Sequence, residues 1–188
     1  MPMAGRKQKA QPSAKAPFTV IINQDSGTAA RLGRAGIEAA IEASGLPLKA
    51  LILAAPKDMG AAVAKAIDDA ASDGAEGHIL VGGGDGSIKH TADAFMKADL
   101  PFGILPLGTM NLTAHDLGLP IELEDIFRAY AGGVVEKRVD AASVNGETFL
   151  CMAAMGAVPR VSKAREDMRG DEGFALMPRL APVVWDNL

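Results

Sequence analysis

Short apolar runs alternate along the chain with longer segments whose apolar residues recur at helical spacing. Runs of four to eight apolar and β-branched residues predict buried strands, and these are residues 18–22, 48–55, 78–81 and 102–106. Stripes at three- and four-residue spacing predict helices at residues 28–43, from Met59 to Ala70, from Ile88 to Phe95 and at residues 121–130. Each predicted strand is therefore followed by a predicted helix.

Four successive strand–helix units indicate a mainly parallel sheet, because parallel strands need a crossover between them. Strands without polar alternation are typical of a sheet covered by helices on both faces. The pattern thus predicts an α/β fold, a three-layer sandwich that spans residues 17–133.

The pattern changes after residue 133. Two extended runs flank Asn145-Gly146, and Asn-Gly between such runs is a strong hairpin signal. We expect a β-hairpin that begins an antiparallel β domain, so that residues 134–188 form an incomplete second, β-sandwich-like domain. A two-stranded hairpin is marginal in water, and its open edge could recruit a second copy of the chain.

Composition and charge narrow the classes of protein. Of the 188 residues 48% are hydrophobic, which excludes a disordered chain, and no apolar run approaches the ~20 residues that span a bilayer. The lone cysteine, Cys151, cannot form an internal disulfide, so we expect a cytoplasmic protein. The net charge of −4 argues against a nucleic-acid partner. Residues 1–16 contain basic residues and no acidic residue, and we expect a disordered basic leader there.

Four glycines and one acid follow the third strand, at residues 82–86. A glycine-rich turn between a strand and a helix, here expected to begin near Ser87, exposes backbone N–H groups to an anion such as phosphate. A carboxylate beside phosphate is repulsive unless a cation lies between them, so Asp85 is predicted to contact Mg²⁺ directly or through water. The alternative is an aspartate that makes a local hydrogen bond in the turn.

Two further polar loops follow strands. After the fourth strand, Thr109 and Asn111 are spaced so that both could face one ligand; alternatively, one of them caps a short helix that ends at Gly118. After the first strand come Asn23 and the small residues Ser26 and Gly27. Because ligands bind beyond the carboxyl ends of parallel strands, all three loops are expected at one edge of the sheet. His90 and His115 have no partner at metal-ligand spacing.

With these stretches in view, the sequence resembles the diacylglycerol kinase catalytic family, which includes bacterial lipid kinases and sphingosine kinases. The resemblance rests on "GGDGS" at 83–87, "PLGTMN" at 106–111 and "INQDSG" at 22–27. It implies Mg²⁺-dependent transfer of the γ-phosphoryl group of ATP to a lipid hydroxyl, diacylglycerol-like or sphingoid, at a membrane surface. The residues that it implies for nucleotide binding, with Asn111 added from the loop spacing, are Asn23, Gly83, Gly84, Asp85, Gly86, Ser87 and Thr109.

Several positions depart from the family pattern. Lys89 and His90 stand where the family usually has Asn-Glu, and family members run to about twice this core, with a late acidic residue that could act as base. We therefore expect a truncated chain, and no general base is identified in it. Two alternatives follow: a non-catalytic nucleotide-binding module, and an enzyme like NAD kinase, against which "PLGTMN" weighs.

Overall fold

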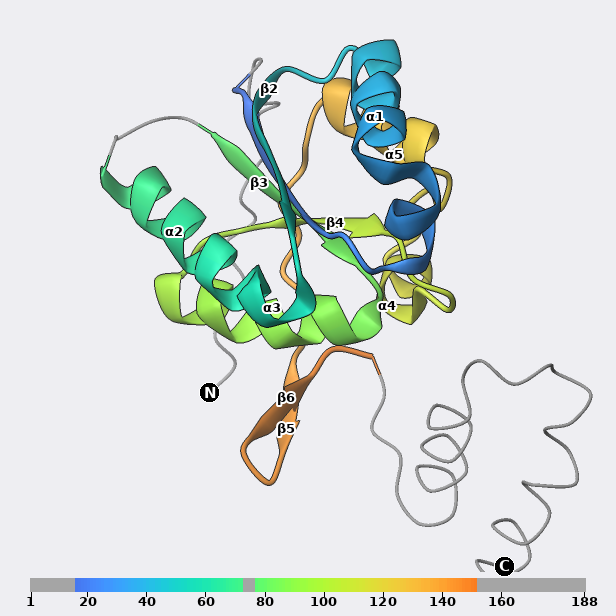
Figure 1. Cartoon of the computed structure of the whole chain (residues 1–188). Helices are drawn as coiled ribbons and strands as arrows, with labels where there is room; N and C mark the ends of the chain where they lie inside the picture. Colours follow the sequence, from blue (N-terminus) through green and yellow to red (C-terminus); the bar gives the residue numbers. More distant parts are fainter. Residues whose placement is uncertain (1–15, 73–76, 152–188) are drawn as a thin grey trace, which may run out of the picture. The chain divides into compact units, whose positions relative to one another are not determined.

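A four-stranded parallel sheet is at the centre of the computed structural model, which describes residues 16–72 and 77–151 (Figure 1). Its strands lie in the order β2-β1-β3-β4, so β1 and β3 are central and β2 and β4 are the edges. The strands are β1 (Phe18–Asn23), β2 (Leu48–Ala54), β3 (His78–Gly83) and β4 (Gly103–Pro106).

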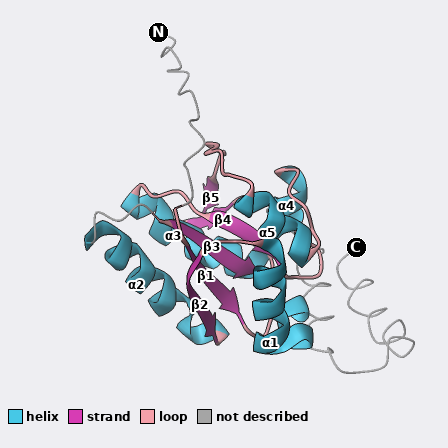
Figure 2. Cartoon of the chain, turned by 90° about the horizontal axis from the view of Figure 1, so that it is seen from above, coloured by secondary structure: helices cyan, strands magenta, loops and turns pink. Residues whose placement is uncertain are grey.

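Helices cover both faces of this sheet (Figure 2). The helices are α1 (Gly27–Ser44), α2 (Met59–Ser72), α3 (Asp85–Ala98), α4 (Leu112–Asp116) and α5 (Leu123–Ala131), with a 3-10 turn at Pro56–Asp58. Alternate residues of β1 serve the two faces: Val20 and Ile22 join the core beneath α1 and α5, and Ile21 joins the core beneath α2 and α3. The predicted three-layer α/β sandwich is thus confirmed.

The observed helices differ from the sequence prediction in several details. Helix α3 begins at Asp85 rather than near Ser87, with Gly84 in extended conformation just before it, so the glycine-rich turn is shorter than expected. Helix α1 is interrupted at Gly33, whose φ of 64° is a left-handed conformation that glycine adopts without strain. No helix in residues 16–72 or 77–151 is both long and apolar enough to cross a membrane.

The predicted hairpin is present, with shorter strands than the extended runs suggest. Strands β5 (Ala142–Val144) and β6 (Glu147–Phe149) pair antiparallel around Asn145 and Gly146, whose φ values of 53° and 82° suit a tight hairpin turn. Residues 134–141 form no strand, and Val135 and Val139 in this segment are exposed. The predicted basic leader and most of the predicted second domain lie outside the described residues.

Tyr130 of α5 completes the edge strand β4. Its hydroxyl accepts a hydrogen bond from Ile104 N at 2.8 Å and donates one to Ile104 O at 3.1 Å. The tyrosine therefore replaces a fifth strand at the backbone groups that β4 would otherwise leave unpaired. Burial raises the pKa of Tyr130 to about 12, and the hydrogen bond to Ile104 lowers it slightly.

Candidate functional site

The loops that follow β1, β3 and β4 meet at the carboxyl edge of the sheet. Asn23, at the end of β1, donates a hydrogen bond from Nδ2 to Ser87 Oγ on α3 at 2.9 Å. The loop after β4 reaches both neighbours: Leu107 O accepts from Thr28 N at 3.1 Å, and Leu107 N donates to Gly83 O at 3.0 Å. The three polar loops that the sequence places at one edge are therefore in direct contact.

The backbones of two loops touch at Gly84 and Gly108. A Cβ added to Gly84 would lie 3.3 Å from Gly108 Cα, and a Cβ added to Gly108 would collide with Gly84 Cα. A Cβ on Gly83 would lie 2.8 Å from Ser87 Oγ. A side chain is thus excluded at Gly83 and Gly108 and is tightly crowded at Gly84, so packing within the protein accounts for these glycines.

Gly86 is different. It lies in the first turn of α3, is exposed, has no positive φ, and a Cβ added there would meet nothing within 4 Å. Alanine is the better helix former, so glycine at this position costs stability without a structural reason within the described residues. This is what a ligand that approaches the backbone closely would require.

The start of α3 also offers free donors. Ser87 N and Ile88 N both donate to Gly84 O, whereas the N–H groups of Asp85 and Gly86 have no acceptor in the described part of the chain. Helix α3 is 14 residues long, so its dipole adds a partial positive charge to the same end. The first turn of α3 therefore combines free N–H groups, a favourable dipole and an absent side chain, which together suit phosphate.

Asp85 joins α3 to α4. Its Oδ2 accepts from Leu112 N at 3.0 Å and its Oδ1 accepts from Thr113 N at 2.9 Å, so the carboxylate caps the first turn of α4. The acid that the sequence predicts as a magnesium ligand thus has a structural role, and its contact with Mg²⁺ stays a prediction. A carboxylate has about four lone-pair sites, so each oxygen of the half-buried Asp85 keeps capacity for one cation or water contact. The residues present fit Mg²⁺, which needs only one or two protein carboxylates when phosphate supplies other oxygens.

Asn111 is turned into its own loop. Its side chain is 6% exposed; Oδ1 accepts from Gly108 N at 2.8 Å, and Nδ2 donates to Gly108 O at 3.0 Å and to Pro106 O at 3.4 Å. Its φ of 49° is the left-handed conformation that asparagine tolerates. The amide stabilises the 106–111 turn, and a direct contact of Asn111 with nucleotide stays a prediction.

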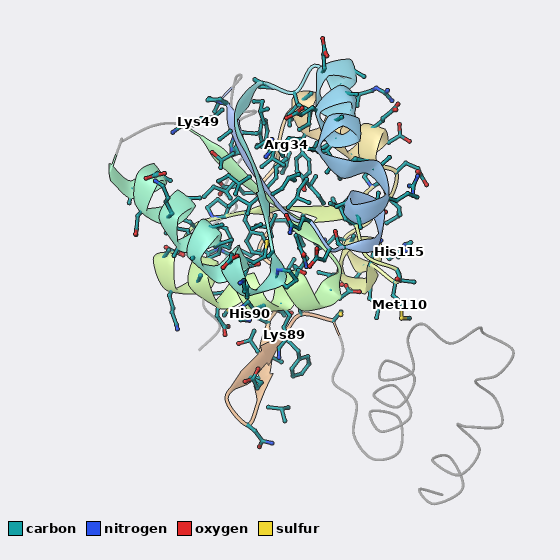
Figure 3. The ribbon with its side chains drawn as sticks, viewed as in Figure 1. Arg34, Lys49, Lys89, His90, Met110 and His115 are labelled. Carbon is teal, nitrogen blue, oxygen red and sulfur yellow. The ribbon has the colours of Figure 1, made fainter. Side chains whose placement is uncertain are left out.

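Thr109 and Met110 form the exposed tip of that turn, and Met110 is 63% exposed (Figure 3). Thr109 makes no hydrogen bond with any residue in the described ranges, so its hydroxyl is available to a ligand. His90 and His115 are exposed, and the described residues contain no group of three or more His, Cys, Asp or Glu side chains that could hold a metal. A metal here would depend on Asp85 and on its phosphate ligand.

Sequence reasoning missed three contacts: the Asn23–Ser87 hydrogen bond, the Asp85 cap on α4, and an ion pair between Lys89 and Glu147. The first two join residues 64 and 27 positions apart, and the third joins residues 58 apart. No local pattern encodes such pairs. The polar character of these side chains and their positions in loops predict that they share one edge of the sheet. These signals do not predict which side chains bond to each other.

A family model decides the relationship. The model described as "Diacylglycerol kinase catalytic domain" matches residues 17–144, more than half of the chain. The chain belongs to the diacylglycerol kinase catalytic domain family. That match covers β1 to β5, and therefore all three loops of the site.

Relatives agree with this family membership, and a solved structure shares the fold. "Probable lipid kinase YegS" of Escherichia fergusonii is 40% identical over 90 residues, which cover 45% of this chain and 29% of the relative. "Probable lipid kinase YegS-like" of Pseudomonas savastanoi pv. phaseolicola is 36% identical over 95 residues, which cover 49% of this chain and 30% of that relative. A diacylglycerol kinase crystal structure from Bacillus anthracis str. Sterne shares the fold, with a TM-score of 0.55 and 23% identity. The similarity covers 73% of this chain and 50% of that one. The match to the curated relatives spans less than a third of their length.

Proposed function

We propose that this domain binds Mg-ATP at the carboxyl edge of its sheet and transfers the γ-phosphoryl group to a lipid hydroxyl. The observation that carries the proposal is Gly86, a costly helix glycine beside the free N–H groups of Asp85 and Gly86. Family membership supports a kinase, and the names of two relatives contain "lipid kinase". Within the family-matched segment, residues 17–133 form the nucleotide-binding domain and residues from 134 begin a second one.

Each loop contributes different groups to Mg-ATP binding. The first turn of α3 receives the phosphates, since its N–H groups and dipole stabilise negative charge before the reaction begins. Ser87, fixed by Asn23, and the exposed Thr109 place hydroxyls at the margins of the same site. Asp85 would hold Mg²⁺, which when bound neutralises phosphate charge.

Phosphoryl transfer requires alignment above all. A bond forms between the acceptor oxygen and the γ-phosphorus, the bond from that phosphorus to the ADP oxygen breaks, and the acceptor proton passes to a base. The contact between Gly84 and Gly108 fixes the two loops without mobile side chains between them, and the Asp85 cap fixes α4 against α3. We assign this chain's residues to phosphate binding and orientation. A lipid acceptor implies that the domain works at a membrane surface.

The experiment is phosphate transfer from γ-labelled ATP into mixed micelles that contain diacylglycerol or sphingosine, with and without Mg²⁺. Labelling of lipid that requires Mg²⁺, at a rate that is at least about tenfold lower in Ser87→Ala, supports the proposal. Labelling of NAD in place of lipid would contradict it. Absence of label from every acceptor by a chain that binds ATP would favour a nucleotide-binding module, a function that the partial match to the relatives also allows.

A further inference from the structure

Lys89 links the candidate site to the hairpin. It lies one helical turn after Asp85 on α3 (Figure 3). Its Nζ is 2.8 Å from Glu147 Oε2 at the start of β6. In the part of the chain that the structure describes, three other ion pairs join residues three or four positions apart on one helix: Arg34–Glu38, Lys65–Asp69 and Asp125–Arg128. The Lys89–Glu147 pair instead bridges two elements that are distant in the sequence.

This pair is poorly suited to hold the hairpin permanently. The side chains of Lys89 and Glu147 are 43% and 76% exposed, and exposed ion pairs contribute little net stability because water and salt compete with them. Asp93, four residues after Lys89 on the same helix, offers a local carboxylate that Lys89 does not use in this structure. Lys89 is therefore a partly exposed cation whose present partner is easily exchanged.

The position of Lys89 favours a different partner. Residues i and i+4 share a helix face, and helical side chains tilt toward the N-terminus, so the turn that contains Asp85 and Gly86 lies on the side of the helix that the Lys89 side chain can reach. That turn holds the two free N–H groups. A polyphosphate bound there carries more negative charge than the single carboxylate of Glu147 and would outcompete it.

We propose that Lys89 is a phosphate-binding residue of this site and that Glu147 holds it while the site is empty. Binding of a polyphosphate moves Nζ from Glu147 to a phosphate oxygen and thereby breaks the ion pair between α3 and β6. This inference rests on the proposed function, because it requires a polyphosphate at the first turn of α3. It adds a residue from this chain's own sequence and couples the site to the hairpin.

Calorimetric titration of inorganic tripolyphosphate and of Mg-ATP, at one fixed ionic strength, tests the exchange. Lys89→Met is expected to weaken the binding of both ligands by about tenfold, because one charge-assisted contact is lost. Glu147→Gln is expected to tighten both by about two- to fivefold, since a competitor is gone. The double variant should match Lys89→Met, because Glu147 acts only through Lys89. Lys97→Met, an exposed lysine near the other end of α3, is the matched control.

A second readout follows the hairpin itself. Cys151 is the only cysteine and is exposed four residues after Glu147, so one fluorescent dye can be attached there. Tripolyphosphate should change the dye's emission in the wild type, because nearby Glu147 loses its partner, and leave it unchanged in Lys89→Met. Wild-type affinity in Lys89→Met, or weaker binding in Glu147→Gln, would overturn the inference and leave the proposed function intact. A wild type that binds neither tripolyphosphate nor ATP would overturn both.

Discussion

Replacing Gly86 by alanine separates ligand binding from folding more cleanly than any other change at this site. The added Cβ meets no protein atom within 4 Å and enters a helical turn with no positive φ. The folded protein therefore accepts the methyl group without strain. Any loss of nucleotide binding must then come from the methyl group and the ligand competing for the same space.

The two effects have opposite signs. Glycine is about 0.5–1 kcal/mol less favourable than alanine within a helix, so Gly86→Ala should raise the free energy of unfolding by up to that amount, less because Gly86 lies in the first turn. Crowding a tightly packed contact costs about 1–3 kcal/mol, which corresponds to roughly a 5- to 150-fold weaker nucleotide complex. A more stable protein that binds ATP poorly is the expected result.

Urea unfolding followed by circular dichroism and calorimetric titration with Mg-ATP measure the two quantities on the same preparations. Gly108→Ala is the matched control, since its Cβ would collide with the backbone at Gly84 and should destabilise the fold by about 1–3 kcal/mol. Wild-type ATP affinity in a stabilised Gly86→Ala protein would refute the reasoning, because the glycine would then have neither a structural nor a ligand-related cause.

Three further predictions concern the contacts around the site. Asp85→Ala removes the cap on α4 and should lower the free energy of unfolding by about 0.5–2 kcal/mol in urea, whereas an unchanged midpoint would show that the cap contributes nothing. Asn111→Ala leaves Gly108 N without its acceptor and should cost about 1–3 kcal/mol in the same measurement; a smaller loss would mean that water replaces the amide. Tyr130, the only tyrosine, should titrate near pH 12 when its absorbance at 295 nm is followed. Because the pKa is raised in the folded protein, the neutral hydroxyl stabilises the fold fully below pH 10, and this stabilisation is lost between pH 10 and 12. Tyr130→Phe should remove that loss, and a midpoint near pH 10 in folded protein would contradict the burial of the hydroxyl.

Much of the fold was accessible from the sequence because its signals are local. The apolar run at 18–22 predicts a buried strand, and the structure has β1 there. The stripe at Met59, Val63 and Ile67 predicts a helix with one buried face, and the structure has α2 there. The parallel order of the strands brings the three loops to one edge, which topology alone requires. The Asn145-Gly146 turn was equally readable, since it needs two residues that tolerate positive φ.

The partners of the polar side chains were not accessible in this way. The glycines at 82–86 look alike in the sequence, yet Cβ atoms at Gly82 and Gly83 would collide with neighbouring protein atoms and one at Gly86 would not. Asp85 could be read as a metal ligand or as a turn residue, and the structure shows an unforeseen cap on a helix 27 positions away. Only the three-dimensional contact between loops distinguishes these roles.

The central claim is that a nucleotide's phosphates bind at the first turn of α3. A proton–nitrogen correlation spectrum of the labelled chain, recorded during titration with Mg-ATP, tests it at the two free amides. We predict that the Asp85 and Gly86 N–H resonances shift strongly and saturate together, and that tripolyphosphate alone reproduces most of these shifts. Saturable ATP binding that leaves both resonances in place, or no ATP binding, would contradict the account.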